Sequence, residues 1–436
     1  MDEATVIALA LVTFGWAVVS ERLATRNLTG PLVFLVAGFI LANPNWGIVD
    51  VDIESSTVHH LAEITLGLVL FADASAVPVK AVRHDLPVTS RLLGIGLPLS
   101  ILAGTAVAVV LFPSLPLALA LVIGASLAPT DAALSATVIA DERLPARVRR
   151  VLNVESGLND GVATPVVTFA IAAAATAIGV TAHSYDSGFG AVGELAIGVA
   201  IGGAVGLVGG RLVHLARQRG WAQHGALRLG TLALALMAFQ ISSEVGGNPF
   251  VAAFVGGLVF GASARSGAEE AATSEEPEKA AEAHLPHEPN EPNEPNEPNE
   301  PAELTELLGS VLSLVLWFIF GAAFVLPAFE ELDAATVVYA VLSLTIVRMV
   351  PVAIALLGSG ERRSTVAFIG WFGPRGLASV VFALLAIEEL GGTDPRVITV
   401  VDAIAITIVL SIVAHGVTAR PLATRYVATP ASAPLR

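Results

Sequence analysis

The sequence has no cysteine and little charge. Of its 436 residues, 14% are charged and 54% are hydrophobic, and the mean hydropathy is +0.75. The missing thiols exclude disulfides, thiolate metal sites and cysteine nucleophiles, but they leave the redox compartment undetermined. Because a soluble domain of this length carries far more charge, the composition predicts an all-α polytopic membrane protein.

Long apolar segments recur through the whole chain. The first follows Met1-Asp2-Glu3 without a basic n-region or a small-residue cleavage site, so it is expected to be retained as a span. With Gly, Pro and charge clusters taken as breaks, the sequence predicts about thirteen transmembrane helices. They are expected near residues 4–20, 30–43, 57–74, 88–112, 116–140, 150–178, 189–215, 226–245, 248–264, 303–326, 333–357, 364–388 and 396–419.

Basic residues lie on alternate connections between these segments. One set of connections and the C-terminal tail contain nearly all the Lys and Arg, whereas the other set contains only Arg396. Two further arginines, Arg348 and Arg375, fall inside predicted spans. Because cytoplasmic loops are rich in basic residues, this pattern predicts a cell-membrane protein with its N-terminus outside and its C-terminus in the cytoplasm.

One segment departs from the membrane composition. Residues 265–302 are rich in Glu, Ala and Pro and contain the tandem repeat Glu-Pro-Asn from Glu288 to Pro301. Proline at every third position is incompatible with a helix and favours an extended, solvated chain. The sequence therefore predicts a disordered acidic cytoplasmic loop, either a simple spacer or a regulatory or cation-attracting segment.

Two predicted spans contain a proline among polar residues at about mid-depth. One carries Pro129-Thr130-Asp131 and the other carries Gly373-Pro374-Arg375-Gly376. Proline removes a backbone donor and disfavours helix at the preceding residue, so both helices are expected to break and to free carbonyl groups for a cation. Two broken helices in corresponding halves of a chain predict an inverted-repeat transporter, here with two six-helix repeats and a midplane site.

The span predicted at 150–178 carries carboxylates near its centre. Asp160 lies about ten residues into an apolar stretch, which at ~1.5 Å per residue places it roughly 15 Å deep, near the middle of the hydrocarbon core. Ser156 is four residues earlier and shares its helix face. A charge at this depth persists mainly where it serves an ion, a proton or a partner, so we interpret Asp160 and Asp131 as members of a cation or proton site.

Other intramembrane charges have structural interpretations. Glu155 and Asn159 share the neighbouring helix face, and Arg348 is the expected ion-pair partner of Glu155 because neither charge is stable alone at this depth. Arg375 is expected to neutralise the dipoles of the broken helices or the carboxylates. Asp73, near the cytoplasmic end of its span, lines the ion pathway in one interpretation and is an interfacial charge in the other.

The run from Glu155 to Gly161, with Pro129-Thr130-Asp131 and Gly373-Pro374-Arg375-Gly376, resembles the NhaP-type sodium/proton antiporters of the monovalent cation:proton antiporter-1 family. The resemblance covers essentially the whole membrane body. It implies the NhaA-like antiporter fold and a homodimer in which a core domain of six helices moves against a dimerisation domain. The corresponding ranges are 1–80, 181–264 and 303–330 for the dimerisation and linking helices, 81–180 and 331–420 for the core domain, 265–302 for the loop and 421–436 for the tail.

The resemblance also implies roles for single residues. Asp160 would be the essential cation- and proton-binding carboxylate. Asp131, Ser156 and the main-chain carbonyl of Thr130 would be the further ligands of the transported sodium ion.

Three more implications concern support, stoichiometry and the pathway. Asn159 would steady the pair of Glu155 and Arg348. The Asn-Asp sequence at 159–160, where electrogenic relatives carry Asp-Asp, implies electroneutral exchange of one sodium or lithium ion for one proton. Asp73 stands where many members have Glu, which leaves its pathway role open.

Other functions remain open at this point. A potassium/proton antiporter uses the same ligand types, and a sodium-coupled symporter can share the inverted-repeat fold. A passive channel could select cations without coupling to protons. An intramembrane aspartyl protease also needs two aspartates at mid-depth, but it would not explain Arg348, Arg375 or the second broken helix. We therefore expect a transporter and not an enzyme, with a monovalent cation and a proton as substrates, membrane lipid around it, no cofactor and no nucleic acid.

Overall fold

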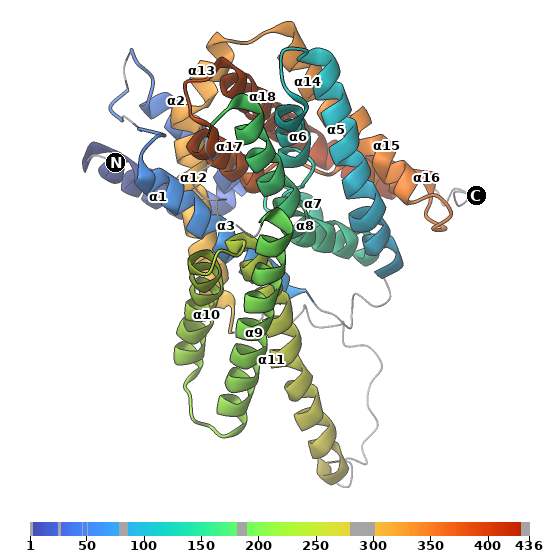
Figure 1. The fold of residues 1–436 in the computed structure, drawn as a ribbon. Helices are drawn as coiled ribbons and strands as arrows, with labels where there is room; N and C mark the ends of the chain where they lie inside the picture. The colour runs from blue at the N-terminus through green and yellow to red at the C-terminus, as the bar shows by residue number, and fades with distance from the viewer. Residues whose placement is uncertain are drawn as a thin grey trace. The chain divides into compact units, whose positions relative to one another are not determined.

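The computed structural model describes residues 3–24, 28–45, 47–49, 51–77, 86–180, 190–279 and 301–428, with backbone alone at 137 and 265–279. The regular elements in these ranges are helices (Figure 1). In chain order they are α1 (Glu3–Ala24), α2 (Gly30–Leu41), α3 (Ser56–Ala76), the π turn η1 (Leu92–Gly96), α5 (Leu97–Leu111), α6 (Leu117–Ser126), α7 (Ala136–Ile139), α8 (Ala146–Ile178), α9 (Gly190–Gln218), α10 (His224–Glu244), α11 (Pro249–Lys279), α12 (Glu303–Ala323), α13 (Val325–Glu330), α14 (Ala334–Leu344), α15 (Ile346–Ala355), α16 (Arg363–Trp371), α17 (Leu377–Leu390) and α18 (Pro395–Ala428).

The lengths and hydropathies of these helices are those of a membrane protein. In the described part of the chain, eight helices are long and apolar enough to cross a bilayer, and three shorter apolar helices accompany them. Each predicted span coincides with one helix or with a pair of helices separated by a short interruption. The predicted all-helical membrane fold is therefore confirmed, while the number of thirteen spans stays a prediction.

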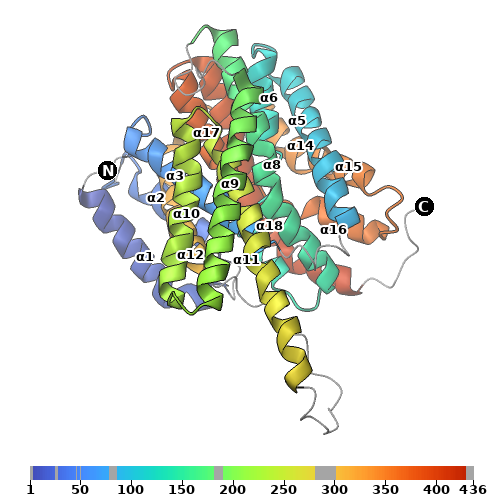
Figure 2. The same cartoon turned by 60° about the horizontal axis from the view of Figure 1, so that its bottom comes forward.

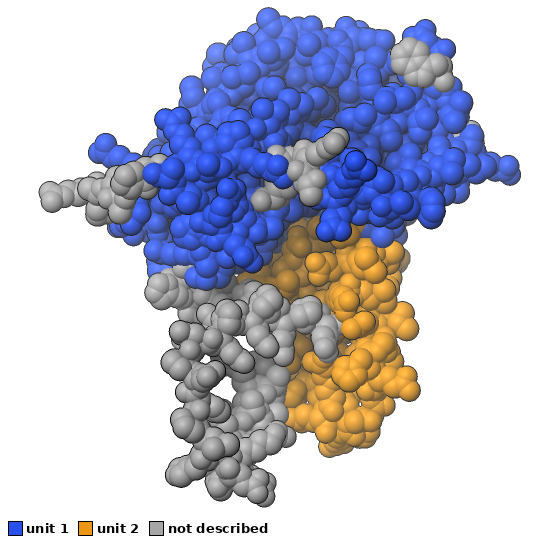
Figure 3. Space-filling model, turned by 180° about the vertical axis from the view of Figure 1, so that it is seen from behind, with its two compact units in different colours: residues 1–66, 80–191, 311–436 blue, residues 67–79, 192–310 orange. Residues whose placement is uncertain are grey.

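The helices gather into two compact units (Figure 3). Unit 1 comprises Met1–Leu66, Lys80–Ala191 and Val311–Arg436, and unit 2 comprises Gly67–Val79 and Val192–Ser310. This grouping places residues 1–66, which were assigned to the dimerisation domain, in the same unit as the core-domain residues 86–180. The assignment of helices to a moving core and a static domain stays a prediction.

Unit 1 contains both predicted interruptions. The helical path that begins with α6 stops at Ser126 and resumes only at α7, and the path of α16 stops at Trp371 and resumes at α17. α17 is buried along nearly its whole length and packs against α8 and α18. The two breaks expected from Pro129 and Pro374 are thus confirmed.

Unit 2 includes α9, α10 and α11, which lie side by side in both ribbon views (Figures 1 and 2), together with the end of α3 and the start of α12. A row of glycines at four-residue spacing on α9 lets this helix approach the backbone of α11. A Cβ at Gly202 would overlap Ala252, and a Cβ at Gly206 would overlap Gly256. The close packing of α9 on α11 therefore depends on side chains being absent along this row.

The glycine row gives a test with a neighbouring control. Gly202→Ala is expected to lower the stability of the folded protein by about 1–3 kcal/mol, because the new methyl group meets the Ala252 backbone, which cannot rotate away. Gly203→Ala, one position along, faces open space and is expected to leave stability unchanged or slightly higher. Thermal unfolding in detergent compares the two variants, and equal melting temperatures would contradict the packing argument.

Part of the segment predicted as a disordered loop is helical in the structure. α11 continues to Lys279, so residues 265–279 are helical in the structure, whereas the sequence pattern assigned them to the loop 265–302. This stretch is rich in alanine and glutamate, which have high helix propensity, and an existing helix extends into such a sequence more readily than a new one starts. Most of the Glu-Pro-Asn repeat lies outside the described residues.

Candidate functional site

Asp131 links the two interruptions. Its main-chain N–H donates to the carbonyl of Pro374 at 2.9 Å. One carboxylate oxygen, Oδ2, accepts from the N–H of Leu377, the first residue of α17, at 3.0 Å, and the other accepts from the N–H of Leu134 at 3.0 Å. A carboxylate stabilises the free N–H groups and the positive end of a helix dipole. Asp131 therefore caps α17 from the opposite interruption.

Arg375 provides the reverse contact. Its Nη1 donates to the carbonyl oxygens of Ala128 at 2.8 Å and Pro129 at 3.2 Å, which follow the C-terminus of α6. The Ser379 hydroxyl on α17 donates to the carbonyl of Ser126 at 2.6 Å. A buried guanidinium suits a helix C-terminus, where free carbonyls carry partial negative charge. Each interruption thus supplies the charge that the other helix end requires, and Arg375 has the position expected for a group that neutralises these dipoles.

Two glycines of the second interruption are required by this close approach. A Cβ at Gly376 would overlap the carboxyl group of Asp131. A Cβ at Gly373 would lie 2.7 Å from Arg348 Nε and 2.8 Å from Thr130 Cγ2. The motif Gly373-Pro374-Arg375-Gly376 therefore combines a helix break with the space that the first interruption occupies.

Thr130 connects the first interruption to the centre of α8. Its Oγ1 lies 2.9 Å from the Oγ of Ser156 and accepts a hydrogen bond from Asn159 Nδ2 at 2.7 Å. Asp160 directly follows Asn159 and lies on the same face of α8 as Ser156, and it is half-buried. The structure therefore brings Thr130, Ser156 and the turn that carries Asp160 together at the point where α6 is interrupted.

Glu155 and Arg348 form an ion pair inside unit 1. Arg348 Nη2, on α15, lies 2.7 Å from Glu155 Oε1, and the two side chains are 2% and 3% exposed. This is the pairing expected from the sequence. Among the described residues, Glu155 Oε2 and Arg348 Nε have no hydrogen-bond partner, so the ion pair itself is the main compensation for burying both charges.

The position of Asn159 differs from the implied one. Its amide donates to Thr130 and, within the described residues, forms no hydrogen bond to Glu155 or Arg348, which it was expected to support. The break after α6 places the Thr130 hydroxyl beside α8, and this hydroxyl accepts the hydrogen bond of the Asn159 amide in place of Glu155. Any support that Asn159 gives the ion pair is therefore indirect.

Asp73 belongs to a different unit from the residues described above. It lies near the C-terminal end of α3, in unit 2, and is half-buried. Its role in the ion pathway stays a prediction.

Three residues around Arg375 were not predicted from the sequence: Ser343, Ser411 and His415. The predicted span 333–357 is interrupted at Thr345, between α14 and α15, and the Ser343 carbonyl accepts from Arg375 Nη2 at 3.1 Å. In an unbroken helix that carbonyl would accept from Val347, so Arg375 replaces a helical hydrogen bond. On α18, Ser411 Oγ accepts from the Arg375 main-chain N–H at 2.8 Å and lies 3.2 Å from His415 Nδ1. The sequence does contain one indication of this contact, because Ser411 and His415 are polar residues four positions apart in an otherwise apolar segment.

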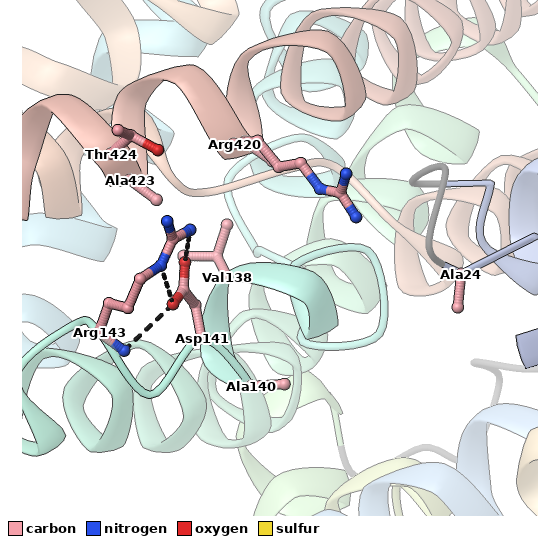
Figure 4. Close-up of a pocket in the computed structure, with 9 residues that line it drawn as sticks. Ala24, Val138, Ala140, Asp141, Arg143, Arg420, Ala423 and Thr424 are labelled. Carbon is pink, nitrogen blue, oxygen red and sulfur yellow. Dashed lines mark hydrogen bonds and ion pairs between the residues drawn. The ribbon is translucent and has the colours of Figure 1, made fainter.

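A cavity of about 520 Å³ opens at the end of α7 remote from Asp131 (Figure 4). Its walls include Asp141 and Arg143 from the connection between α7 and α8, and Arg420 and Thr424 from α18. Asp141 accepts from Arg143 Nε at 2.9 Å and Nη2 at 2.7 Å, and this guanidinium holds the pKa of the Asp141 carboxyl below its usual range. The pair is therefore charged at neutral pH and fixes the turn between the two helices. The basic residues on these walls belong to connections that the charge pattern places in the cytoplasm.

Comparisons with known proteins agree on one family. An uncharacterized Na⁺/H⁺ exchanger of Mycobacterium tuberculosis is 34% identical over 265 residues, which are 58% of this chain and 44% of the relative. The uncharacterized Na⁺/H⁺ exchanger YjcE of Escherichia coli is 27% identical over 174 residues, which are 39% of this chain and 30% of that protein. The regions matched in this chain thus span less than half the length of these relatives.

Solved structures and a family profile extend the similarity to the whole chain. The sodium proton antiporter MjNhaP1 from Methanocaldococcus jannaschii at pH 8 has a TM-score of 0.73 and 20% identity, with 98% of both chains covered. A second structure of that antiporter gives a TM-score of 0.68 at 18% identity. These similarities show a common fold. The profile of the family described as sodium/hydrogen exchanger, transmembrane, matches residues 7–425, and the chain therefore belongs to the sodium/hydrogen exchanger family.

Proposed function

We propose that this protein is a secondary antiporter that exchanges sodium or lithium for protons across the cell membrane. The observation that carries the proposal is the meeting of two interrupted, mutually capped helices with the turn of α8 that bears Ser156 and Asp160. Interrupted helices at mid-membrane are the usual place for an ion site in an inverted-repeat transporter. Membership of the sodium/hydrogen exchanger family supports the same activity.

The proposed cation ligands are oxygen atoms. They are the carboxylates of Asp160 and Asp131, the Ser156 hydroxyl and the Thr130 carbonyl. Both oxygens of Asp131 already accept a hydrogen bond, but a carboxylate has about four lone-pair sites, so it can also face a cation. Oxygen ligands of this kind suit a hard alkali cation.

The proposed mechanism is competition of the proton and the cation for the carboxylate of Asp160. A bare carboxylate at hydrocarbon depth is unfavourable, and either a proton or a dehydrated sodium ion removes the excess charge. A proton on Asp160 removes the charge that attracts the cation, so the proton and the cation do not bind together. The site therefore takes one or the other, and if only the loaded forms can move between the two sides, exchange is obligatory.

Electroneutral exchange is the finer part of this proposal. The residue before Asp160 is Asn159, whose amide has no proton to exchange and is engaged with Thr130. One titrating group at this turn of α8 gives one proton for one cation. Transport is then expected to decrease at acid pH, where protons occupy the site, and again at alkaline pH, where too few protons are available for the return step.

The assembly and its orientation are part of the same proposal. We infer a homodimer, in which residues 81–180 and 331–420 form the moving core and 1–80, 181–264 and 303–330 form the dimerisation and linking helices. The N-terminus lies outside and the residues after 420 in the cytoplasm. Asp73 on α3 is a candidate for the ion pathway.

Proteoliposomes with an internal pH dye test the activity. With a preset pH gradient, sodium and lithium are expected to drive proton movement, and clamping the membrane potential at zero is expected to leave the rate unchanged because the exchange moves no net charge. Liposomes without protein are the control. A response to potassium alone would favour the potassium/proton antiporter, and sodium flux without proton movement would favour the channel.

A further inference from the structure

His415 joins α18 to the end of α16. Its Nε2 lies 2.8 Å from the carbonyl oxygen of Trp371, the last residue of α16, which also accepts from the N–H of Gly373. The imidazole is buried and packs on the Trp371 indole with the ring centroids 5.3 Å apart. Because the last carbonyls of a helix lack intrahelical donors, His415 completes the C-terminus of α16 at the edge of the second interruption.

The bond to Trp371 fixes where the ring carries a proton. Only an Nε2–H can donate to the Trp371 carbonyl. On the other side, Nδ1 lies 2.8 Å from the carbonyl oxygen of Ser411 and 3.2 Å from its hydroxyl. A neutral ring accepts from the hydroxyl, and a charged ring donates to the carbonyl. The bond to Trp371 is kept in both forms, so it does not depend on the protonation state of His415.

Ser411 carries the contact onward to Arg375. The Ser411 hydroxyl accepts from the Arg375 main-chain N–H at 2.8 Å, and the Arg375 guanidinium holds the carbonyls of Ala128 and Pro129. Thr130 and Asp131 are the next two residues. Hydrogen bonds, joined through the side chain of Arg375, therefore link His415 with a neutral ring to the backbone that immediately precedes the proposed cation ligands.

We propose that His415 is a positioning residue for the cation site. Through Trp371 it holds the end of α16, and through Ser411 it holds Arg375, so it sets the backbone of the first interruption at residues 128–131. This inference rests on the proposed exchange function. In the described contacts His415 touches none of the proposed ligands, so it acts on the geometry of the site and not on the bound ion.

His415→Leu preserves the volume of the side chain and removes both polar contacts. Residues that orient ion ligands typically change ion affinity by about ten- to a hundredfold when they are lost, so the KM for sodium is expected to rise about tenfold, with a smaller change in maximal rate. His415→Gln is expected to restore most of the affinity, because its amide can donate to the Trp371 carbonyl. Ser411→Ala is expected to raise KM as well, and the double variant should be no worse than the more affected single one.

Thr418→Val is the matched control. The Thr418 hydroxyl accepts from Trp371 Nε1 at 2.9 Å, so this variant also removes a hydrogen bond between α18 and the same tryptophan. In the described contacts Thr418 is not linked to Arg375 through Ser411, so the KM of this variant for sodium is expected to equal that of the wild type even where its melting temperature is lower.

Sodium-driven proton flux is measured against sodium concentration in proteoliposomes, with detergent melting of each variant. No flux in the wild type would overturn the proposed exchange and this inference with it. Wild-type flux with an unchanged KM in His415→Leu, or an equal rise in Thr418→Val, would overturn the positioning role alone. If His415→Leu fails to fold, Ser411→Ala decides in its place, and an unchanged KM there overturns the role.

Discussion

Asp160→Asn is expected to abolish sodium-driven proton flux and to leave the fold intact. Asparagine has nearly the same shape as aspartate, but it carries no charge for a cation and no proton to release. The group lost is the one that the two substrates share in the proposed mechanism, so the rate is expected to decrease by at least about a hundredfold, the lower end of what a positioned proton-transfer group contributes.

The local structure of α8 makes this variant a fair test. The Asp160 main-chain carbonyl accepts a hydrogen bond at 2.6 Å from the Thr164 hydroxyl, and Asp160→Asn leaves this bond in place. Asp131 would be a less direct test, since its carboxylate also caps α17, and its loss would combine changes in binding with changes in stability. Flux and thermal melting of Asp160→Asn are therefore measured together.

Asp141→Asn provides the matched control. Asp141 is an aspartate of the same unit, but it lies at the remote end of α7 and pairs with Arg143. This control is expected to transport at the wild-type rate. Retained flux in Asp160→Asn, or equal loss in Asp141→Asn, would reject the assignment of Asp160 as the exchanging carboxylate.

The parts of the site that follow from local chemistry were predictable from the sequence. Pro129 and Pro374 break their helices because the ring lacks a donor and restricts the preceding residue, whatever surrounds it. Glu155 and Arg348 pair because neither charge is stable alone at hydrocarbon depth. These effects depend on one residue or on a pair of opposite charges, so they can be recognised in the sequence without knowledge of the packing.

The parts that depend on the packing of distant segments were not predictable. Asp131 was recognised as a site carboxylate, but its role as the N-terminal cap of α17 requires the two interruptions to cross. At the break at Thr345, Arg375 donates to the Ser343 carbonyl, and the two residues of this contact are 32 positions apart in the sequence. His415 was overlooked for the same reason, because its partner Trp371 is 44 residues away in the sequence.

Glu155→Ala is expected to destabilise the protein by about 3–5 kcal/mol, because it leaves the buried charge of Arg348 without its ion-pair partner. Arg348 would stay charged, because a guanidinium does not lose its proton in proteins, and it would stay buried beside Gly373 and Thr130 without its carboxylate. The measurement is thermal unfolding in detergent, and an unchanged melting temperature would contradict the structural role of the pair.

Two further variants distinguish the cost of an unpaired buried charge from the cost of losing an ion pair in general. Arg228→Ala breaks the pair of Arg228 and Glu303, whose side chains are 39% and 51% exposed, and it is expected to change stability by at most about 1 kcal/mol. Glu155→Ala combined with Arg348→Met removes both buried charges, and it is expected to recover much of the lost stability because no charge is left unpaired. If the double variant is as unstable as Glu155→Ala, the energy comes from lost packing, whereas recovery identifies the buried guanidinium as its source.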